Sequence, residues 1–289
     1  MGKAYDEDLE ARKPLICTVL HFSSKPPEKN AAIPLHVVPA WNGSRCKDYH
    51  VCETLARWAE TKMKSQNKKP HVQLRDHNAS SGAAVYTPAT LALYDVFVLG
   101  FSNSLVWKCP SRLILDLYNQ HVSPKHLDIG VGTGYFMDHC RFPASPKIAL
   151  VDLNPNCLEK AARRLLRYAP TCHVGNVLEP IDIGSSGFGS IGLNYLLHCL
   201  PGDLKSKSIV FQNLKPLLKD GGMIFGSTIL GRDVKHNFLA KKLMRAYNAR
   251  GIFSNWSDSQ EDLEAGLRAH FNQCTIRVKG CVALFSGKN

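Results

Sequence analysis

A carboxylate followed by three alternating glycines is the part of this sequence best suited to chemistry. Asp128 lies in the short apolar run that opens the segment HLDIGVGTGYF, and Gly130, Gly132 and Gly134 follow it. Glycine tolerates positive φ and lets a ligand lie directly against the backbone. The next residues resemble a helix start, whose free N–H groups favour a negatively charged partner by about 0.3–1 kcal/mol. The segment therefore predicts a ligand-binding turn between a strand and a helix.

The position of the acid separates two classes of ligand. A dinucleotide fold expects G-x-G-x-x-G, with the pyrophosphate at the helix start. Here the pattern is D-x-G-x-G-x-G, with Asp128 two residues before the first glycine. A carboxylate at that place suits an ammonium group better than a pyrophosphate. A glycine-rich turn that binds nothing is the structural alternative.

This arrangement resembles motif I of the class I S-adenosylmethionine-dependent methyltransferases. The resemblance implies S-adenosylmethionine as the cofactor, with its methionine amine near Asp128. Similarity continues in FGSTILGR (225–232) and AYNARGIFSN (246–255) and covers roughly residues 85–286. It points to small, single-domain methyltransferases whose acceptor is a small molecule or unassigned.

A second acid, Asp152, ends the apolar run KIALVD, 24 positions after Asp128 (152 − 128). Ligands of open parallel sheets lie at the carboxyl ends of the strands. A carboxylate there can accept both ribose hydroxyls, so Asp152 and the adjacent Leu153 are predicted to bind the cofactor. In the alternative interpretation, Asp152 caps the helix that begins near Pro155.

Two residues after the next strand are predicted to contact the adenine. The family usually carries an Asp here, which receives the adenine amino group, whereas this chain has Asn176. The side-chain carbonyl of Asn176 can still accept that hydrogen bond. Val177 could pack on the adenine face, although a plain loop remains the alternative.

The segment that begins at Asn194 is predicted to face the methyl end of the cofactor, with Asn194 in the binding site. It lacks the Asn-Pro-Pro-Tyr tetrapeptide of enzymes that methylate exocyclic amines, which counts against a nucleobase acceptor. His198 is the candidate base, because imidazole titrates near neutral pH. A histidine satisfied by backbone groups is the alternative.

Aromatic residues before the glycine turn are predicted to form a lid. Tyr94 could close over the sulfonium, since a cation is attracted to an aromatic face, and it is the second candidate catalytic residue. A position in the core is equally compatible with the sequence. The other predicted lid residues are Tyr86, Asp95 and Trp107.

Strand-like and helix-like runs alternate through the second part of the chain, which predicts βαβ units and a parallel sheet. The fold class is therefore α/β: a Rossmann-like, seven-stranded, mostly parallel sheet with helices on both faces and an antiparallel C-terminal hairpin strand. The predicted strands are 126–129, 147–152, 171–175, 188–195, 223–230, 274–279 and 282–286. The predicted helices are 88–100, 110–121, 135–140, 155–168, 203–219, 237–250 and 259–271.

The chain divides into two parts by composition. Residues 1–80 are predicted to be an N-terminal extension, partly irregular or disordered, and residues 81–289 the S-adenosylmethionine-binding methyltransferase domain. Cys46, His50 and Cys52 are grouped in the extension, but they lack the paired spacing of a zinc site, so no metal is predicted.

The net charge of +12, from 36 basic and 24 acidic residues, could indicate a nucleic-acid partner. The basic clusters are not interleaved with aromatic residues that would stack on bases, which favours a solvated basic face over a nucleic-acid partner. Ten scattered cysteines without a C-x-x-C pair favour a reducing compartment. No apolar run approaches the roughly 20 residues of a membrane span. A cytoplasmic protein with no membrane partner is predicted, and its oligomeric state stays open.

The sequence thus predicts a methyltransferase that holds a small-molecule acceptor in line with the methyl group, at about 3–3.5 Å. One alternative binds the cofactor but catalyses a reaction other than methylation, such as a rearrangement. Another methylates RNA or protein through the basic N-terminal segment. A third is a binding protein that has lost turnover.

Overall fold

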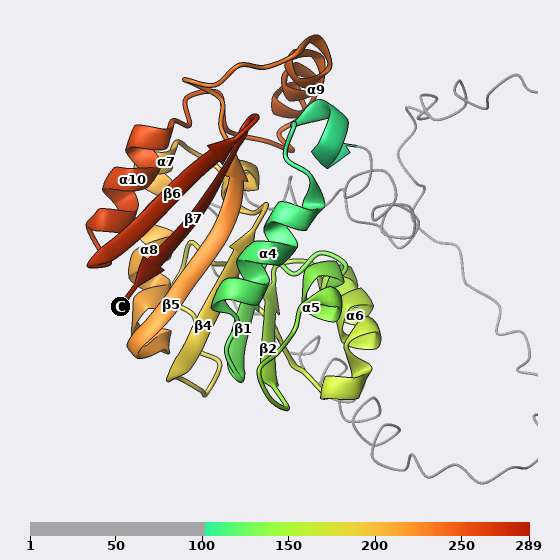
Figure 1. The fold of residues 1–289 in the computed structure, drawn as a ribbon, viewed down its shortest axis with the longest axis vertical. Helices are drawn as coiled ribbons and strands as arrows, with labels where there is room; N and C mark the ends of the chain where they lie inside the picture. The colour runs from blue at the N-terminus through green and yellow to red at the C-terminus, as the bar shows by residue number, and fades with distance from the viewer. Residues whose placement is uncertain (1–101) are drawn as a thin grey trace, which may run out of the picture. The chain divides into compact units, whose positions relative to one another are not determined.

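The computed structural model describes residues 102–289, which form a seven-stranded sheet with helices on both of its faces (Figure 1). The predicted helix 88–100 and the predicted domain boundary after residue 80 lie outside the described residues.

The sheet has the strand order β3-β2-β1-β4-β5-β7-β6. Strands β1 to β5 are parallel, and β7 runs antiparallel between β5 and β6, so the predicted fold class is confirmed. The chain reverses its direction of travel across the sheet between β1 and β4, and ligands of open α/β sheets bind at such a switch point. The strands are β1 (Lys125–Ile129), β2 (Lys147–Asp152), β3 (Thr171–Val174), β4 (Phe188–Asn194), β5 (Leu218–Ile229), β6 (Gln273–Lys279) and β7 (Val282–Lys288).

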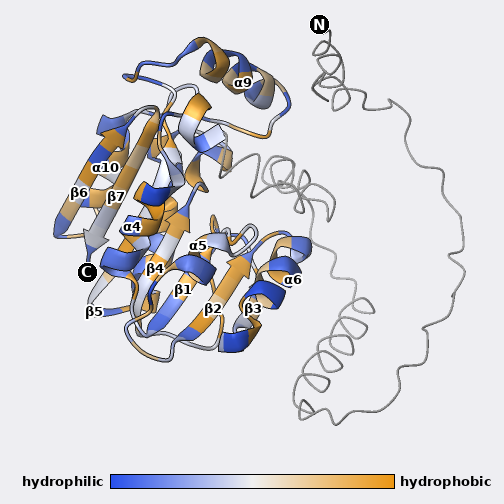
Figure 2. Ribbon diagram, turned by 45° about the vertical axis from the view of Figure 1, so that its right-hand side comes forward, coloured by the Kyte–Doolittle hydropathy of each residue, from blue (hydrophilic) through white to orange (hydrophobic). Residues whose placement is uncertain are grey.

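Two apolar clusters lie on opposite faces of the sheet, because successive strand side chains point to opposite sides. In β2, Ile148 and Leu150 belong to one cluster, and Ala149 and Val151 to the other. Figure 2 shows the hydrophobic strands between helices whose outer sides are hydrophilic. The first cluster is packed by α4 (Ser111–His121), α5 (Tyr135–His139), α6 (Pro155–Arg164) and α9 (Phe238–Ala249). The second is packed by α7 (Leu204–Lys207), α8 (Ile209–Leu214) and α10 (Gln260–Arg268).

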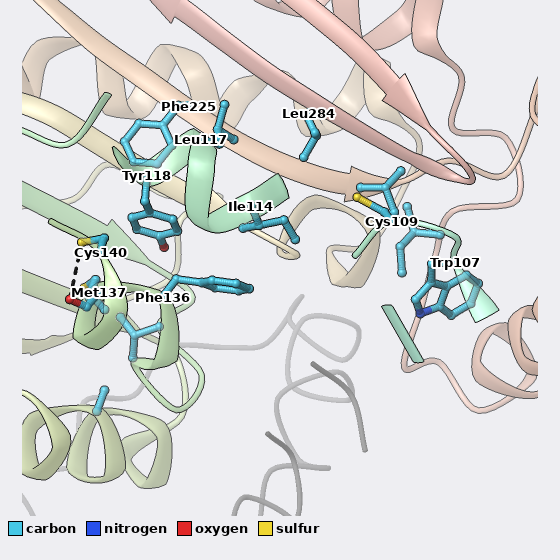
Figure 3. Close-up of a cluster of buried hydrophobic side chains, with 14 of the residues drawn as sticks. Trp107, Cys109, Ile114, Leu117, Tyr118, Phe136, Met137, Cys140, Phe225 and Leu284 are labelled. Carbon is cyan, nitrogen blue, oxygen red and sulfur yellow. Dashed lines mark hydrogen bonds between the residues drawn. The ribbon is translucent and has the colours of Figure 1, made fainter. Parts of the chain in front are cut away.

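Tyr118 of α4 lies at the centre of the first cluster (Figure 3). Its ring stacks on Phe136 at 5.6 Å and meets the edge of Phe225 at 5.1 Å, measured between centroids. α4 matches the predicted helix 110–121, and its buried residues are Ile114, Leu117 and Tyr118. α4 packs on β5 and β4, and its Tyr118 reaches across to Asp128 of β1.

One predicted helix is interrupted and ends two residues early. The expected helix 203–219 consists of α7, α8 and the 3₁₀ turn η4 (Lys215–Leu217), and β5 already begins at Leu218. The side chain of Ser208 donates to the backbone oxygen of Lys205 between α7 and α8, which competes with helical hydrogen bonds. Pro216 has no N–H and cannot continue the helix. Gly221, at φ +68°, then lies where the register between β4 and β5 shifts.

Candidate functional site

The turn after β1 takes a left-handed backbone at each of its three glycines. Gly130, Gly132 and Gly134 have φ angles of +69°, +53° and +71°. A Cβ on Gly130 would lie 2.8 Å from the side chain of Leu196, and one on Gly134 would lie 3.1 Å from the backbone of Ala161. A Cβ on Gly132 would meet nothing within 4 Å. Two glycines therefore let the protein pack closely, while the middle one borders open space that a ligand can fill.

Asp128 is buried at the carboxyl end of β1 and accepts a hydrogen bond from the hydroxyl of Tyr118 at 2.7 Å. Burial, and then the charge of Asp128, hold the pKa of Tyr118 well above its usual value, so the phenol stays a donor. Asp128 was predicted from its motif, whereas the sequence analysis did not assign Tyr118 to the site. A buried tyrosine needs a partner for its hydroxyl, and this is the signal that could have identified it.

Asn194 ends β4 and presents an amide nitrogen to the same place. Its Oδ1 accepts a hydrogen bond from the hydroxyl of Ser227 at 3.1 Å. Its Nδ2 is buried, interacts electrostatically with the hydroxyl of Tyr118 and makes no hydrogen bond of normal geometry among the described residues. A buried donor that lacks a hydrogen bond costs about 1–3 kcal/mol, so this amide is suited to an acceptor that a ligand brings.

These groups line one open pocket, whose empty space is about 410 Å³ with the adjoining solvent included. Five predicted binding residues contribute to its wall: Asp128, Gly130, Gly132, Gly134 and Asn194. Residues that the sequence analysis did not assign to the site complete the wall: Tyr118, Val131, Thr133, Tyr135, Phe136, Met137 and Tyr195. Tyr195 has a left-handed backbone at φ +53°, which is uncommon for a bulky residue and often marks a functional turn.

Asp152 ends β2 outside that wall and supports the glycine turn from the side. Its Oδ1 accepts a hydrogen bond from the backbone N–H of Asn154 at 2.8 Å. Burial raises the pKa of Asp152 to about 6, although backbone N–H groups of Asn154, Gly132 and Val131 favour the charged form. The cap of α6 is the side chain of Asn154, so the alternative interpretation of Asp152 as the helix cap is wrong. The adjacent Leu153 is an exposed hydrophobic residue.

Asn176 and Val177 follow β3 and do not line the pocket. The Oδ1 of Asn176 accepts a hydrogen bond from the backbone N–H of Leu178 at 3.1 Å, which leaves one lone pair of that oxygen. Val177 is buried, and its backbone oxygen accepts a hydrogen bond from the amide of Asn213 at 3.0 Å. These residues lie at the correct end of the sheet for a cofactor, one strand further out than Asp152.

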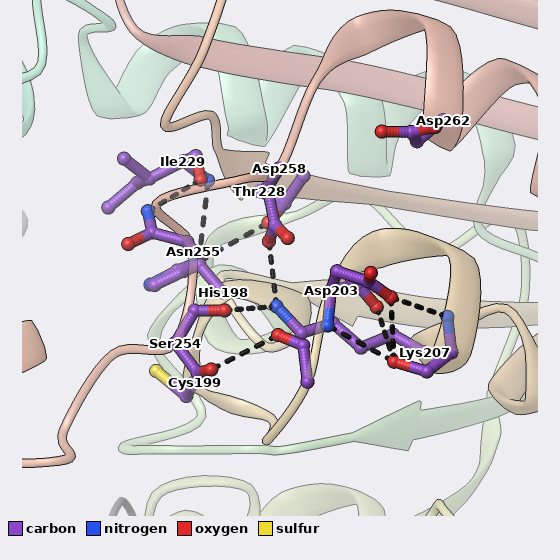
Figure 4. A network of polar contacts seen from close by, with 12 residues as sticks. His198, Cys199, Asp203, Lys207, Thr228, Ile229, Ser254, Asn255, Asp258 and Asp262 are labelled. Carbon is purple, nitrogen blue, oxygen red and sulfur yellow. Dashed lines mark hydrogen bonds and ion pairs between the residues drawn. The ribbon is translucent and has the colours of Figure 1, made fainter.

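The geometry does not favour His198 as a base. Its ring is buried and does not line the pocket, and its Nδ1 accepts a hydrogen bond from the backbone N–H of Ile229 at 3.4 Å (Figure 4). Burial, and then the charge of Lys207, lower the pKa of His198 to about 3. A ring that resists protonation and already accepts a backbone hydrogen bond fits the structural alternative better.

The predicted lid is only partly described. Tyr86, Tyr94 and Asp95 lie outside the described residues. Trp107 is buried in the first cluster, with its ring centroid 6.1 Å from that of Phe253, so this predicted lid residue is instead part of the core. Within residues 102–289, no three His, Cys, Asp or Glu side chains gather where they could hold a metal ion.

The chain matches a family model described as a methyltransferase domain over residues 127–224. Demethylluteothin O-methyltransferase of Streptomyces thioluteus is 38% identical over 213 residues, which cover 73% of this chain and 93% of that protein. Methyltransferase verB of Penicillium polonicum is 41% identical over 223 residues, which cover 71% of this chain and 97% of that protein.

Solved structures show the same fold at lower identity. An O-methyltransferase family protein from Burkholderia thailandensis has a TM-score of 0.54 at 14% identity, covering 83% of this chain and 70% of that chain. The structure of PigF with SAH has a TM-score of 0.52 at 18% identity, covering 83% of this chain and 72% of that chain.

The predicted family is thus confirmed by sequence identity along nearly the whole length of two methyltransferases, and this chain belongs to the class I S-adenosylmethionine-dependent methyltransferases.

Proposed function

We propose that this protein transfers the methyl group of S-adenosylmethionine to a hydroxyl oxygen of a small-molecule acceptor. The relatives support this choice of acceptor. One that is 38% identical is named demethylluteothin O-methyltransferase, and another, 36% identical, is named for the physcion biosynthesis cluster of Aspergillus chevalieri.

The observation that carries the proposal is the set of groups gathered at the switch point between β1 and β4. A buried carboxylate, Asp128, suits the ammonium of an amino acid. The amide nitrogen of Asn194 suits an acceptor oxygen such as its carboxylate. Gly132 leaves open space where any side chain would intrude. The donors and acceptors therefore fit the methionine end of the cofactor.

The remaining cofactor contacts follow the strand ends outward across the sheet. Asp152 would accept the ribose hydroxyls, with Leu153 beside it, and Asn176 and Val177 would contact the adenine. Gly130 and Gly134 allow the close packing that shapes the glycine turn.

When bound, the cofactor supplies a methyl group that its sulfonium has already activated. The protein then needs to position the acceptor and exclude water, which together supply most of the rate gain. Tyr195, at the end of β4, lines the pocket beside Asn194 and would help to shape the acceptor side. We leave His198 out of the catalytic set because of its burial. Tyr94 stays a prediction.

We also propose a cytosolic location and no nucleic-acid substrate. Free thiols at all seven described cysteines support a reducing compartment. A further finding concerns membranes: within residues 102–289, no helix combines the length and apolar character that crossing a bilayer needs.

The test uses the full chain and S-adenosylmethionine with a deuterated methyl group. The protein is incubated with a panel of phenols, and the products are weighed by mass spectrometry. We expect the label on a hydroxyl oxygen of a small acceptor, and its loss in Asp128→Ala. Label found only on added RNA or protein, or a consumed acceptor without label, would instead support one of the alternative functions.

Binding is tested separately by isothermal titration with SAH (S-adenosylhomocysteine). Binding by the wild-type protein and its loss in Asp128→Ala are expected. A wild-type protein that does not bind SAH would contradict the proposed function.

A further inference from the structure

Two hydrogen-bond acceptors face each other beneath the glycine turn. The Nε2 of His126 lies 3.8 Å from Oδ2 of Asp128, and both side chains are buried. Nε2 has no hydrogen-bond partner among the described residues. Gly192, on the neighbouring strand β4, leaves room for the pair, since a Cβ there would lie 3.3 Å from each of the two side chains. This arrangement has no role in the proposed function, which uses Asp128 alone.

Hydrogen bonds on the other side of the ring show which nitrogen carries a proton. The hydroxyl of Ser123 donates to the backbone oxygen of Lys125 at 2.8 Å, so it can only accept from Ser190, at 3.0 Å. The hydroxyl of Ser190 therefore donates its single proton to Ser123 and cannot also donate to His126. At 2.8 Å, Ser190 therefore accepts from Nδ1 of His126. A neutral His126 would then present a bare lone pair on Nε2 to the carboxylate.

Two lone pairs that face each other in the interior repel, and one additional proton removes the conflict. A buried carboxylate also needs a countercharge or strong donors. Within residues 102–289, no lysine or arginine forms an ion pair with Asp128, and Tyr118 provides one neutral donor. A protonated His126 would supply the missing countercharge at ion-pair distance.

We propose that His126 is protonated in the ligand-free protein, as an ion pair with Asp128, and that binding of the cofactor's ammonium releases this proton from Nε2 to solvent. The inference rests on the proposed function. Two cations beside one buried carboxylate repel each other strongly, because the interior screens charges poorly. His126 is thus a positioning residue that keeps Asp128 ionised and aligned until the ligand arrives.

The other titratable groups around His126 and Asp128 differ in whether they change protonation near neutral pH. Burial raises the pKa of Tyr118, and it raises the pKa of the Cys140 thiol to about 12, so both stay protonated at neutral pH. Asp152, which interacts electrostatically with Asp128, has a pKa raised to about 6 by burial and titrates in the neighbouring range. The other side chains that contact His126 do not titrate: Phe142, Ser190 and Phe225.

The experiment is isothermal titration of the full chain with SAH from pH 6 to 8.5, in phosphate and in Tris, whose ionisation enthalpies differ. We expect the wild-type protein to release up to one proton per SAH at the acidic end and almost none at pH 8.5. Since the free protein then holds the extra proton, the affinity should rise by up to about tenfold per pH unit across that transition.

Two variants separate His126 from its neighbours. In His126→Gln, the amide faces Asp128 but cannot titrate. Of the proton release on SAH binding, only the smaller part that comes from Asp152 should then remain. His270→Gln changes a histidine outside the proposed site and should behave as wild type. A wild-type protein with the same proton release and pH profile as His126→Gln overturns the inference. Absence of SAH binding at every pH contradicts the proposed function instead.

A measurement on the unaltered protein covers the case in which His126→Gln does not fold. The imidazole ¹⁵N signals of His126 are assigned through contacts with Phe225, whose ring centroid lies 5.8 Å away. At pH 6.5 they should show an imidazolium in the ligand-free protein and a neutral ring after SAH is added. A neutral ring in the ligand-free protein at that pH overturns the inference.

Discussion

The three glycines of the turn have different surroundings. Substitutions at them should therefore affect the free energy of unfolding and the affinity for SAH to different extents. We expect Gly132→Ala to cost only the left-handed backbone strain, about 1–2 kcal/mol, because its Cβ meets nothing. The same Cβ enters the pocket and should weaken SAH binding. Gly134→Ala adds a contact of 3.1 Å with the backbone of Ala161 and should destabilise the protein more. Chemical denaturation and SAH titration of both variants test this, and equal losses of stability would contradict it.

The hydroxyl of Tyr118 has a measurable role because its partner is a buried carboxylate. Tyr118→Phe keeps the ring packing against Phe136 and Phe225 but removes the donor. Hydrogen bonds to charged groups contribute about 1.5–3 kcal/mol, so we expect a loss of that size in the free energy of unfolding, together with weaker SAH binding. Denaturation by urea measures the first effect. An unchanged midpoint would show that water replaces the hydroxyl.

The raised pKa of Asp152 predicts how this residue affects stability as pH changes. Its pKa in the folded protein, about 6, lies above the ordinary value of 3.8, so the folded state holds the proton more tightly. The contribution of Asp152 to stability is therefore fully present below pH 3.8 and is lost as pH rises through about 6. Relative to Asp152→Asn, the wild-type protein should lose stability across that window in urea titrations. A constant difference between the two proteins would refute the assignment.

At the scale of elements, one buried ion pair joins α7 to the segment that precedes α10. The Nζ of Lys207 lies 2.7 Å from Oδ2 of Asp258 and donates to the backbone oxygen of Ser254 at 2.6 Å (Figure 4). Ser254 in turn donates its N–H to the backbone oxygen of His198. The pair therefore fixes the turn after β4 relative to the segment that follows α9.

Removing one partner should cost more than removing both. We expect Asp258→Leu to destabilise the protein by about 3–5 kcal/mol, because it leaves the Lys207 charge buried and uncompensated. The double variant Lys207→Met with Asp258→Leu should recover much of that loss. Denaturation of the two single variants and the double variant forms the cycle. Additive losses would show that the two residues act independently.

At the scale of the whole molecule, the cofactor site joins elements that are distant in the sequence, so a ligand there should stabilise the fold as a unit. The pocket draws on α4, β1, the glycine turn and β4. With SAH at 100 times its Kd, the free energy of unfolding should rise by about 2.7 kcal/mol. Thermal denaturation with and without SAH measures this, with Asp128→Ala as the control that should not respond.

The sequence by itself determined the order of the elements and the position of the turn. Side chains repeat every 2 residues along a strand and every 3.6 residues along a helix, and glycines mark the turns between elements. These signals depend only on residues that are close in the chain. The predicted strand 147–152 matches β2, and Asp128 and the three glycines lie at the switch point as expected. The alternation also predicted the parallel sheet.

Only the tertiary structure decided which polar groups meet. Tyr118 reaches Asp128 because α4 packs on β4 and β5, and His126 meets Ser190, 64 positions away. The Oδ1 of Asn194 is held by the hydroxyl of Ser227 on another strand, 33 positions away. His198 is surrounded by β5 and Phe253, which turns a candidate base into a core residue. Such contacts join residues far apart in the chain, and local periodicity holds no information about them.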